Sequence, residues 1–277
     1  NSRALLWDTI REAIPFIITG SAIQLFQIID QATFIHVMGW ISKYSKSELL
    51  VQFAYFSANP NKITMILIAV ATSIGGVGIP LLTENYVKGD FRAAGKLVQD
   101  NLTMLVAFLL PATIGAVAIA EPLYTVFYGK PDSLALGLFI LAMLQTIILG
   151  LYTVLSPMIQ ALFQNRKAIL YFGYGVLVKL ILQVPFIYFF KAYGPLLSTT
   201  IGLMIPIVLM YKEIHVVTKF NRKTVFKRSL LTAILTLIML LVVLVAGFIL
   251  GLVIKPNGRV TSMIYVAVIG GVGIIVY

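Results

Sequence analysis

Two ionisable side chains, Asp30 and Lys179, lie deep within long apolar stretches of the sequence. A charge inside a membrane span is costly, marks a candidate functional residue and is expected to have a partner of opposite sign. Two roles stay open for this pair. It is either a structural salt bridge, or a site where Lys179 attracts an anionic group as a compact point charge while Asp30 competes for it or binds a coupling cation.

A stripe of amide and hydroxyl side chains lies next to Asp30. Ser21, Gln24, Gln27 and Gln31 follow one another at intervals of three and four residues, so they share one face of a helix. Such a face is costly against lipid and is expected to point to the bundle interior or to water. Hydrogen bonds between helices would explain the glutamines equally well. The stripe therefore predicts either a polar cavity or a polar helix contact on this segment.

The sequence offers few other groups for chemistry. It has two histidines, His36 and His215, which fall on opposite sides of the membrane in the topology below, and it has no cysteine. No HExxH, GxSxG, P-loop or paired-carboxylate motif is present. We therefore predict no catalytic residue, no metal site and no cofactor, and we expect a protein that is not an enzyme.

Composition defines the class of protein that carries these side chains. Of the 277 residues, 60% are hydrophobic and 11% are charged, whereas soluble domains are about 45–50% apolar and about 25% charged. This excludes a soluble globular domain and a disordered chain. Lys and Arg outnumber Asp and Glu by 21 to 10. In a membrane protein that excess belongs in cytoplasmic loops, so it does not indicate a nucleic-acid partner.

Eight stretches are long enough to cross a bilayer as helices, which takes about 20 apolar residues each. The stretch 13–38 carries Asp30, 168–190 carries Lys179, and the other six carry no charge. Those six are 63–83, 101–120, 133–165, 192–211, 229–254 and 260–277. Continuous runs of this length favour helices over the short alternating strands of a barrel. The sequence thus predicts an all-α, polytopic transmembrane helix bundle.

Two segments need a closer interpretation. The stretch 133–165 exceeds one crossing, and we interpret it as one long helix that bends near Ser156-Pro157 and projects into the cytoplasm. The segment 39–62 is expected outside, either as an ordinary loop or with a short helix that opens at Ser47.

The basic residues set the orientation. With a cytoplasmic N-terminus and one crossing per stretch, thirteen Lys and Arg lie inside, seven lie outside and Lys179 lies within a span. Those inside are Arg3, Arg11, Lys88, Arg92, Lys96, Arg166, Lys167, Lys212, Lys219, Arg222, Lys223, Lys227 and Arg228. The segment 212–228 supplies six of them and is predicted to be cytoplasmic.

Helix-breaking residues are frequent inside the stretches. Proline removes a backbone hydrogen bond and kinks a helix, and transporters use broken helices where backbone lines a cavity. Glycine and proline are also common in membrane helices in general. We interpret the following residues as candidate hinges or kinks: Gly75, Gly76, Gly78, Pro80, Pro111 and Pro185.

The two ends suggest an incomplete chain. The sequence does not begin with Met, and its last apolar stretch reaches Tyr277 without a flanking charge. We interpret the chain as a piece of a longer protein, with the missing part before Asn1 and a little after Tyr277.

Three groups of residues carry a resemblance to a known family. The first runs from Ile79-Pro80 to Lys88-Gly89-Asp90, the second from Leu110-Pro111 to Tyr128-Gly129, and the third from Lys179 to Thr199. In this order and spacing the chain resembles the C-terminal half of bacterial flippases for lipid-linked oligosaccharides. These belong to the multidrug/oligosaccharidyl-lipid/polysaccharide exporter superfamily. The peptidoglycan lipid II flippases of the MurJ/YtgP type and the stage V sporulation protein B group are the most similar.

The resemblance implies a fourteen-helix transporter. Residues 1–218 would be its second six-helix lobe, and 219–277 would be two additional C-terminal helices, truncated at the end, that help to form a groove for a lipid tail. The segment 79–90 would be a cytoplasmic hinge region. No span here contains an arginine, whereas some of these flippases have cavity arginines, largely in the first lobe.

The resemblance also implies a function. A lipid-linked saccharide precursor, with lipid II of cell-wall synthesis as first candidate, would pass from the cytoplasmic to the outer leaflet of the bacterial plasma (inner) membrane by alternating access. Lys179 would attract its pyrophosphate in the inward-open state. The implied partners are this substrate, membrane lipids, the missing N-terminal lobe of the same chain and a coupling cation.

Two alternatives stay open at this point. A multidrug/cation antiporter of the same superfamily would use Asp30 to attract organic cations. A polytopic enzyme acting on polyprenyl-linked sugars would need clustered carboxylates or a His/Arg group in an outer loop, and the outer loops expected here contain neither.

Overall fold

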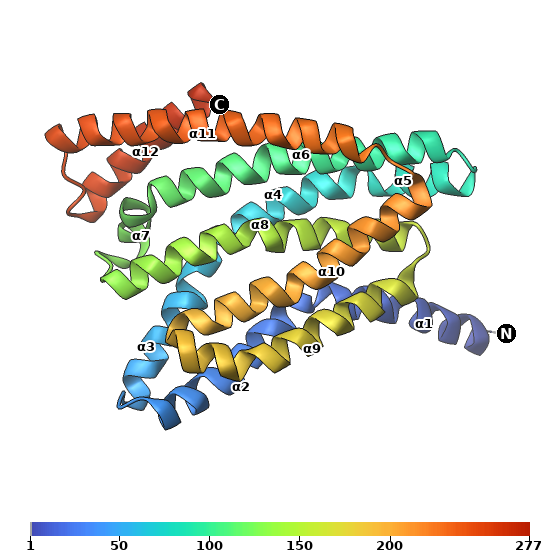
Figure 1. Cartoon of the computed structure of the whole chain (residues 1–277), viewed down its shortest axis with the longest axis horizontal. Helices are drawn as coiled ribbons and strands as arrows, with labels where there is room; N and C mark the ends of the chain where they lie inside the picture. The colour runs from blue at the N-terminus through green and yellow to red at the C-terminus, as the bar shows by residue number, and fades with distance from the viewer. Residues whose placement is uncertain (1) are drawn as a thin grey trace.

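A computed structural model describes residues 2–277, and nearly all of them are α-helical (Figure 1). Asn1, which the sequence places on the cytoplasmic side, lies outside the described residues. The helices are α1 (Ser2–Gly20), α2 (Ala22–Ile41), α3 (Lys46–Phe56), α4 (Ala58–Val77), α5 (Ile79–Val87), α6 (Phe91–Ala118), α7 (Ala120–Tyr128), α8 (Ser133–Ala161), α9 (Asn165–Phe190), α10 (Gly194–Thr218), α11 (Arg222–Val253) and α12 (Arg259–Val276). A 3₁₀ turn, η1 (Lys191–Tyr193), joins α9 to α10. The predicted all-α membrane bundle is confirmed.

The described residues contain six helical stretches long and apolar enough to cross a membrane, or seven if the bent pair α1–α2 is one span. One of the six, Asn165–Thr218, has 54 residues, more than twice the length that a single crossing needs. It is a hairpin, because Lys167 near its start pairs with Glu213 near its end, and Lys179 bonds to Thr199 near its middle. With the two arms α9 and α10 counted separately, residues 2–277 pass through the bundle eight times.

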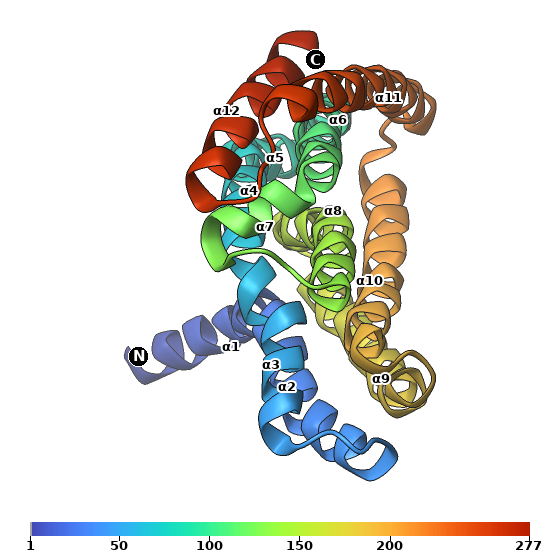
Figure 2. The ribbon, with the colours of Figure 1, turned by 90° about the vertical axis from the view of Figure 1, so that its left-hand side faces the viewer.

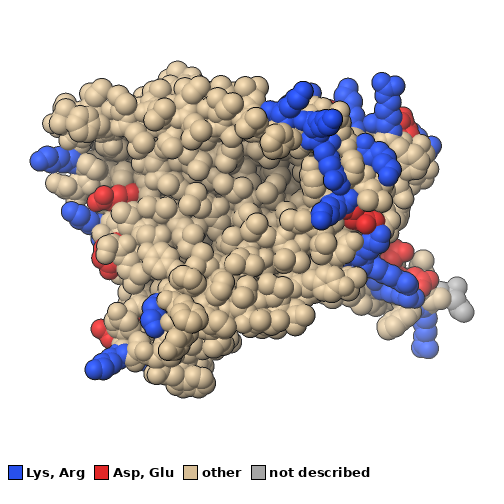
Figure 3. All heavy atoms as spheres, viewed as in Figure 1, with Lys and Arg blue, Asp and Glu red and all other residues tan. Residues whose placement is uncertain are grey.

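The connections between these passes gather at two opposite ends of the molecule (Figure 1). One end holds the connections α2–α3, α7–α8 and α11–α12 together with η1. The other holds the start of α1 and the connections α5–α6, α8–α9 and α10–α11. Most of the Lys and Arg visible in Figure 3 lie at this second end. The arrangement agrees with one crossing per predicted stretch.

Helix α8 forms the centre of the bundle. Half of the residues in its apolar window are buried, against a third or less in the other spans. It is predominantly apolar, as expected for a helix that its neighbours cover, and it packs against α4, α6 and α10. The prediction of one long helix over 133–165 is confirmed for Ser133–Ala161, with Pro157 inside it.

The first span is broken in a way that the sequence pattern does not predict. Instead of one helix over 13–38, α1 and α2 meet at Ser21 with a bend of 55° (Figure 2). Two side chains of α8 stabilise the break. Tyr152 Oη donates to the backbone oxygen of Thr19 at 3.0 Å, and Gln160 Nε2 donates to Thr19 Oγ1 at 3.0 Å.

The break between α4 and α5 falls within the predicted glycine-proline run. Gly78 separates the two helices, and Pro80 lies in the first turn of α5, where its missing N–H is not needed. Asn101 of α6 donates its side-chain amide to the oxygens of Gly75 at 3.1 Å and Ile74 at 3.4 Å. These are among the carbonyls that the end of α4 leaves without a helical partner.

The other hinge candidates do not lie at a break between helices. Gly76 lies near the end of α4, whereas Pro111 and Pro185 lie inside α6 and α9, which continue past them. A hinge role for these residues and for Gly75, Gly78 and Pro80 stays a prediction.

Candidate functional site

The two intramembrane charges selected from the sequence form an ion pair. Lys179 of α9 donates to Asp30 Oδ1 of α2 across 2.6 Å. The Lys179 side chain is fully buried, and Asp30 is 7% exposed. Removing either partner alone would leave an uncompensated charge inside the bundle, which is far more costly than the loss of an exposed pair.

Four further oxygens surround the Lys179 ammonium. Thr199 Oγ1 lies at 2.8 Å, Gln183 Oε1 at 3.1 Å, Ser198 Oγ at 3.2 Å and the Pro195 carbonyl at 3.5 Å. An ammonium has three protons, so these acceptors and Asp30 share them. The charge is thereby solvated by the protein, which offsets the cost of its burial.

Gln183 connects the pair to its surroundings. Its Nε2 donates to Asp30 Oδ1 at 2.9 Å and to Thr33 Oγ1 at 2.8 Å, and its Oε1 accepts from Ser198 at 2.6 Å. Sequence reasoning did not select Gln183 as a site residue. Its position four residues after Lys179, on the same helix face, is the signal that would have found it.

Close packing of α9 against α10 brings Ser198 and Thr199 to this site. A Cβ on Gly175 would lie 2.5 Å from the backbone oxygen of Gly202, and one on Gly202 would lie 3.1 Å from the Lys179 Cβ. Glycine at both positions lets the two backbones approach this closely. Ser198 and Thr199 belong to the third group of residues that carries the family resemblance, but the sequence does not show that they contact Lys179, because that contact depends on the register of the hairpin.

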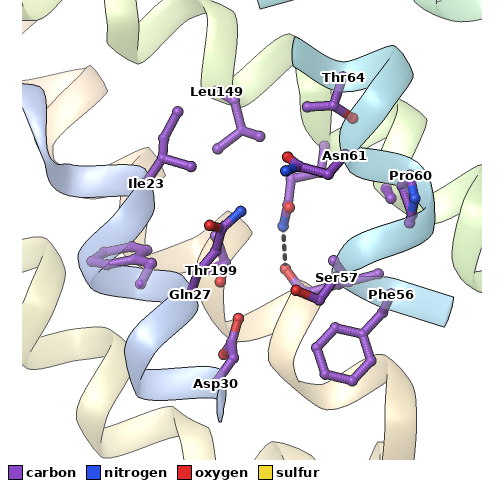
Figure 4. A pocket seen from close by; sticks show the side chains of 14 residues that line it. Ile23, Gln27, Asp30, Phe56, Ser57, Pro60, Asn61, Thr64, Leu149 and Thr199 are labelled. Atoms are coloured by element: carbon purple, nitrogen blue, oxygen red, sulfur yellow. Dashed lines mark hydrogen bonds between the residues drawn. The ribbon is translucent and has the colours of Figure 1, made fainter. Parts of the chain in front are cut away.

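A polar pocket opens beside the ion pair, between α2, α4, α8 and α10 (Figure 4). It has a volume of about 550 Å³, its open mouth included. Gln27 and Asp30 of α2, Asn61 of α4 and Thr199 of α10 contribute polar atoms to its lining. Lys179 does not line it and lies behind Asp30. Asp30 is thus the charged group that the pocket presents.

Of the three glutamines in the stripe, only Gln27 lines this pocket. Gln27 is half-buried and lines it, whereas Gln24 and Gln31 are exposed on the surface of the described bundle. The structure therefore brings Asp30, Lys179 and Gln27 together and leaves Gln24 and Gln31 outside.

A second, apolar cavity lies between α6, α11 and α12. It has a volume of about 1030 Å³ with its mouth, and its lining includes Pro111, Gly115, Met239, Val243 and Ile269. The two C-terminal helices thus form an apolar groove with α6.

Comparison with known proteins gives one informative relative. No family model matches the chain, and no solved structure matches it. The chain is 28% identical over 280 residues to the lipid II flippase MurJ of Bacillus subtilis (strain 168). The match covers 99% of this chain and 51% of the relative. The protein is therefore a distant homologue of this lipid II flippase, and the chain spans about half of that relative's length.

Proposed function

We propose that this chain is part of a transporter that moves a lipid-linked saccharide precursor across a bacterial plasma membrane by alternating access, with lipid II as its first candidate substrate. The observation that carries the proposal is the similarity along 99% of the chain to a protein described as a lipid II flippase. The polytopic helix bundle is the architecture that such an activity needs. Residues 1–218 would act as the second lobe, and 219–277 as two additional helices.

The two cavities support the proposal because they match the two ends of such a substrate. The pocket with Gln27, Asp30 and Thr199 offers polar groups to a head group. The groove around Met239 and Ile269 offers apolar surface to a lipid tail. Gln24 and Gln31, exposed on α2, would line the cavity shared with the N-terminal lobe.

The ion pair suggests how the head group binds. In this structure the Lys179 ammonium is bound by Asp30, so a pyrophosphate can reach it only if the carboxylate moves away. In the proposed mechanism the substrate replaces Asp30 as the anion beside Lys179 in the inward-open state. The released carboxylate then binds a coupling cation or water. Exchange of one anion for another avoids an unpaired buried charge at any step.

The distribution of charge supports an orientation. The end that carries segment 212–228 also carries most of the basic residues visible in Figure 3, and we propose that it faces the cytoplasm.

A multidrug/cation antiporter is the second candidate, since Asp30 is the charged residue that lines the polar pocket. Organic cations would pair with Asp30 directly and would need no contact with Lys179. The two candidates therefore differ in which member of the pair they require.

The experiment places the full-length protein in a strain depleted of its own lipid II flippase, and in liposomes with lipid II, another polyprenyl-pyrophosphate-linked saccharide, or ethidium. We expect movement of the lipid-linked saccharides and growth of the strain. Lys179→Met, which keeps most of the stem volume, should abolish both without preventing membrane insertion. Asp30→Asn should change the ion or pH dependence of transport. Lys43→Met, in an exposed loop, is the matched control.

The double variant Asp30→Asn/Lys179→Met separates the roles. If the pair is only structural, removing both charges should restore transport, because no buried charge is left unpaired. If Lys179 binds substrate, the double variant stays inactive. Full activity of Lys179→Met would refute the binding role, ethidium transport without saccharide transport would favour the antiporter, and cleavage of the saccharide would favour the enzyme.

A further inference from the structure

A third cavity lies on the face of the bundle where α10 and α11 diverge. It has a volume of about 720 Å³ with its mouth. Leu102 and Val106 of α6, Leu151 and Leu155 of α8, Ile207 and Val208 of α10 and Val225 of α11 form its apolar part. Helices α10 and α11 barely touch one another, because α11 packs on α6 instead. The cavity is therefore a gap between α10 and α11 that α6 and α8 close from below, and we call it the α10–α11 groove.

One end of the α10–α11 groove is basic. Lys212, six residues before the end of α10, and Arg222, at the start of α11, belong to its lining, and both are exposed. The Arg222 guanidinium lies 5.7 Å from the centre of the Tyr211 ring, which also lines the groove. The aromatic ring holds the cation at the groove end, with its N–H groups free for an anion.

The positive charge at this end is largely uncompensated. Within residues 2–277, neither Lys212 nor Arg222 lies within 4.0 Å of a carboxylate, and the same holds for Lys219, Lys223 and Lys227. The two acidic residues nearby are already paired, Asp100 with Arg228 at 3.0 Å and Glu213 with Lys167 at 2.6 Å. Figure 3 shows basic side chains gathered on this face around the α10–α11 connection.

The start of α11 adds to this field. Asn221 caps the helix through the Thr224 N–H, and the first turn contains no acidic residue. Arg222 and Lys223 instead place two cations at the positive end of the helix dipole, which is the unfavourable arrangement. A bound anion would offset that repulsion and also accept from free N–H groups of the first turn.

The groove lies in the part of the bundle next to the α10–α11 connection. Apart from Val106, just past the middle of α6, its apolar residues come from the halves of α6, α8, α10 and α11 on that side. The basic end is thus at the membrane surface, and the apolar part extends toward the bilayer centre. This is the arrangement of a phospholipid, with a charged phosphate above an acyl chain.

We propose that the α10–α11 groove binds an anionic phospholipid of the leaflet on its side, which is the cytoplasmic leaflet in the orientation proposed above. One acyl chain fills the gap between α8, α10 and α11, and the phosphate contacts Lys212 and Arg222. Basic pockets between membrane helices on the cytoplasmic side are known to bind anionic head groups. The lipid then connects the two C-terminal helices to the lobe, which they otherwise contact through α6 and α7.

The test uses the full-length protein in a neutral detergent, with bound lipid measured by native mass spectrometry. The probes are phosphatidylglycerol, phosphatidylcholine with the same acyl chains, and inorganic phosphate. We expect phosphatidylglycerol to bind, phosphatidylcholine to bind at least about tenfold more weakly, and phosphate alone not to bind, because each basic contact contributes about 1 kcal/mol.

Two variants with a matched control locate the site. Lys212→Gln/Arg222→Gln should weaken phosphatidylglycerol binding about tenfold or more. Lys223→Gln/Lys227→Gln removes the same charge from the same segment but not from the groove lining, and should weaken binding far less. Val208→Trp fills the apolar part with all charges kept, and should reduce binding of the phospholipid without changing elution of the folded protein in size-exclusion chromatography.

Four results would overturn the proposal. Equal losses in the two charge variants would mean diffuse attraction to a basic surface. Equal binding of phosphatidylcholine would mean an apolar groove without a head-group site. Unchanged binding in Val208→Trp would place the lipid elsewhere. Displacement of phosphatidylglycerol by an equimolar amount of lipid II would make the groove a substrate site.

Discussion

Asp30 and Lys179 are 149 positions apart in the chain and 2.6 Å apart in the structure. The Asp30 carboxylate also accepts from Gln183 at 2.9 Å. The pair thereby joins the first span to the α9–α10 hairpin through a largely buried network that meets the polar pocket at Asp30. Each charge is compensated only when α2 and α9 are packed together, so loss of either charge is expected to destabilise the bundle.

We predict that the two single neutralisations destabilise the protein more than the double one. Lys179→Met or Asp30→Asn leaves one buried charge unpaired, at a cost of about 3–5 kcal/mol, whereas removal of both leaves none. Thermal unfolding in detergent measures the difference. Lys43→Met serves as the control and should unfold like the parent. A double variant less stable than both singles would contradict the expectation.

We predict that Gly175→Ala disrupts the α9–α10 hairpin. The added methyl group would lie 2.5 Å from the Gly202 oxygen and 2.9 Å from Pro206 Cδ, so the two helices must separate, at a cost of about 1–3 kcal/mol. Gly173→Ala lies on the same helix, where a Cβ meets nothing within 4 Å. That control should be neutral or stabilising, because alanine favours a helix over glycine. Equal unfolding temperatures for the two variants would refute the prediction.

We predict that Asn101→Ala weakens the α4–α5 break. The side-chain amide of Asn101 donates to the buried Gly75 carbonyl and the partly buried Ile74 carbonyl, and its loss leaves both without that partner, at a cost of about 1–3 kcal/mol. Asn85→Ala is the control, since Asn85 donates only to Leu81 of its own helix. Thermal unfolding of the two variants makes the comparison, and a larger loss in Asn85→Ala would argue against a role for Asn101.

We predict the sidedness of three exposed positions. In a background without other cysteines, Tyr44→Cys and Asn257→Cys should react with an impermeant maleimide added to intact cells, and Asn221→Cys should react only after lysis. All three residues are exposed, so a lack of reaction reports the membrane side and not burial. Labelling of Asn221→Cys in intact cells would reverse the orientation.

The passes through the membrane were predictable because long apolar runs and charged loops are local signals. The pairing of Asp30 with Lys179 was also predictable, since two isolated charges inside a membrane bundle each need a partner. The break at Ser21 was not, because the groups that stabilise it, Tyr152 and Gln160, come from a distant helix. Local sequence does not show which helix supplies such bonds.

The short helix after the first span shows the limit of a local signal. The sequence suggests a start at Ser47 or an ordinary loop, whereas α3 begins at Lys46 with Ser45 as its cap. Glu48 lies three residues after Ser45, and its carboxylate accepts a hydrogen bond from the Ser45 N–H at 2.7 Å, which completes a capping box. This bond is the main reason that the pKa of Glu48 is below its ordinary value. The Ser-x-x-Glu spacing in the sequence would have identified the correct residue.

The separation between Asp30 and Lys179 also has a consequence for biosynthesis. At about 5–20 residues per second, a ribosome needs about 7–30 s to reach Lys179 after it has made Asp30. During this interval the Asp30 carboxylate lacks the Lys179 ammonium with which it pairs in the folded bundle. Thr19 of the same span likewise lacks its two hydrogen-bond donors, Tyr152 and Gln160, until α8 has been synthesised. Within residues 2–277, this span is therefore made before the other spans, yet it can form these contacts only after α8 and α9 have been synthesised.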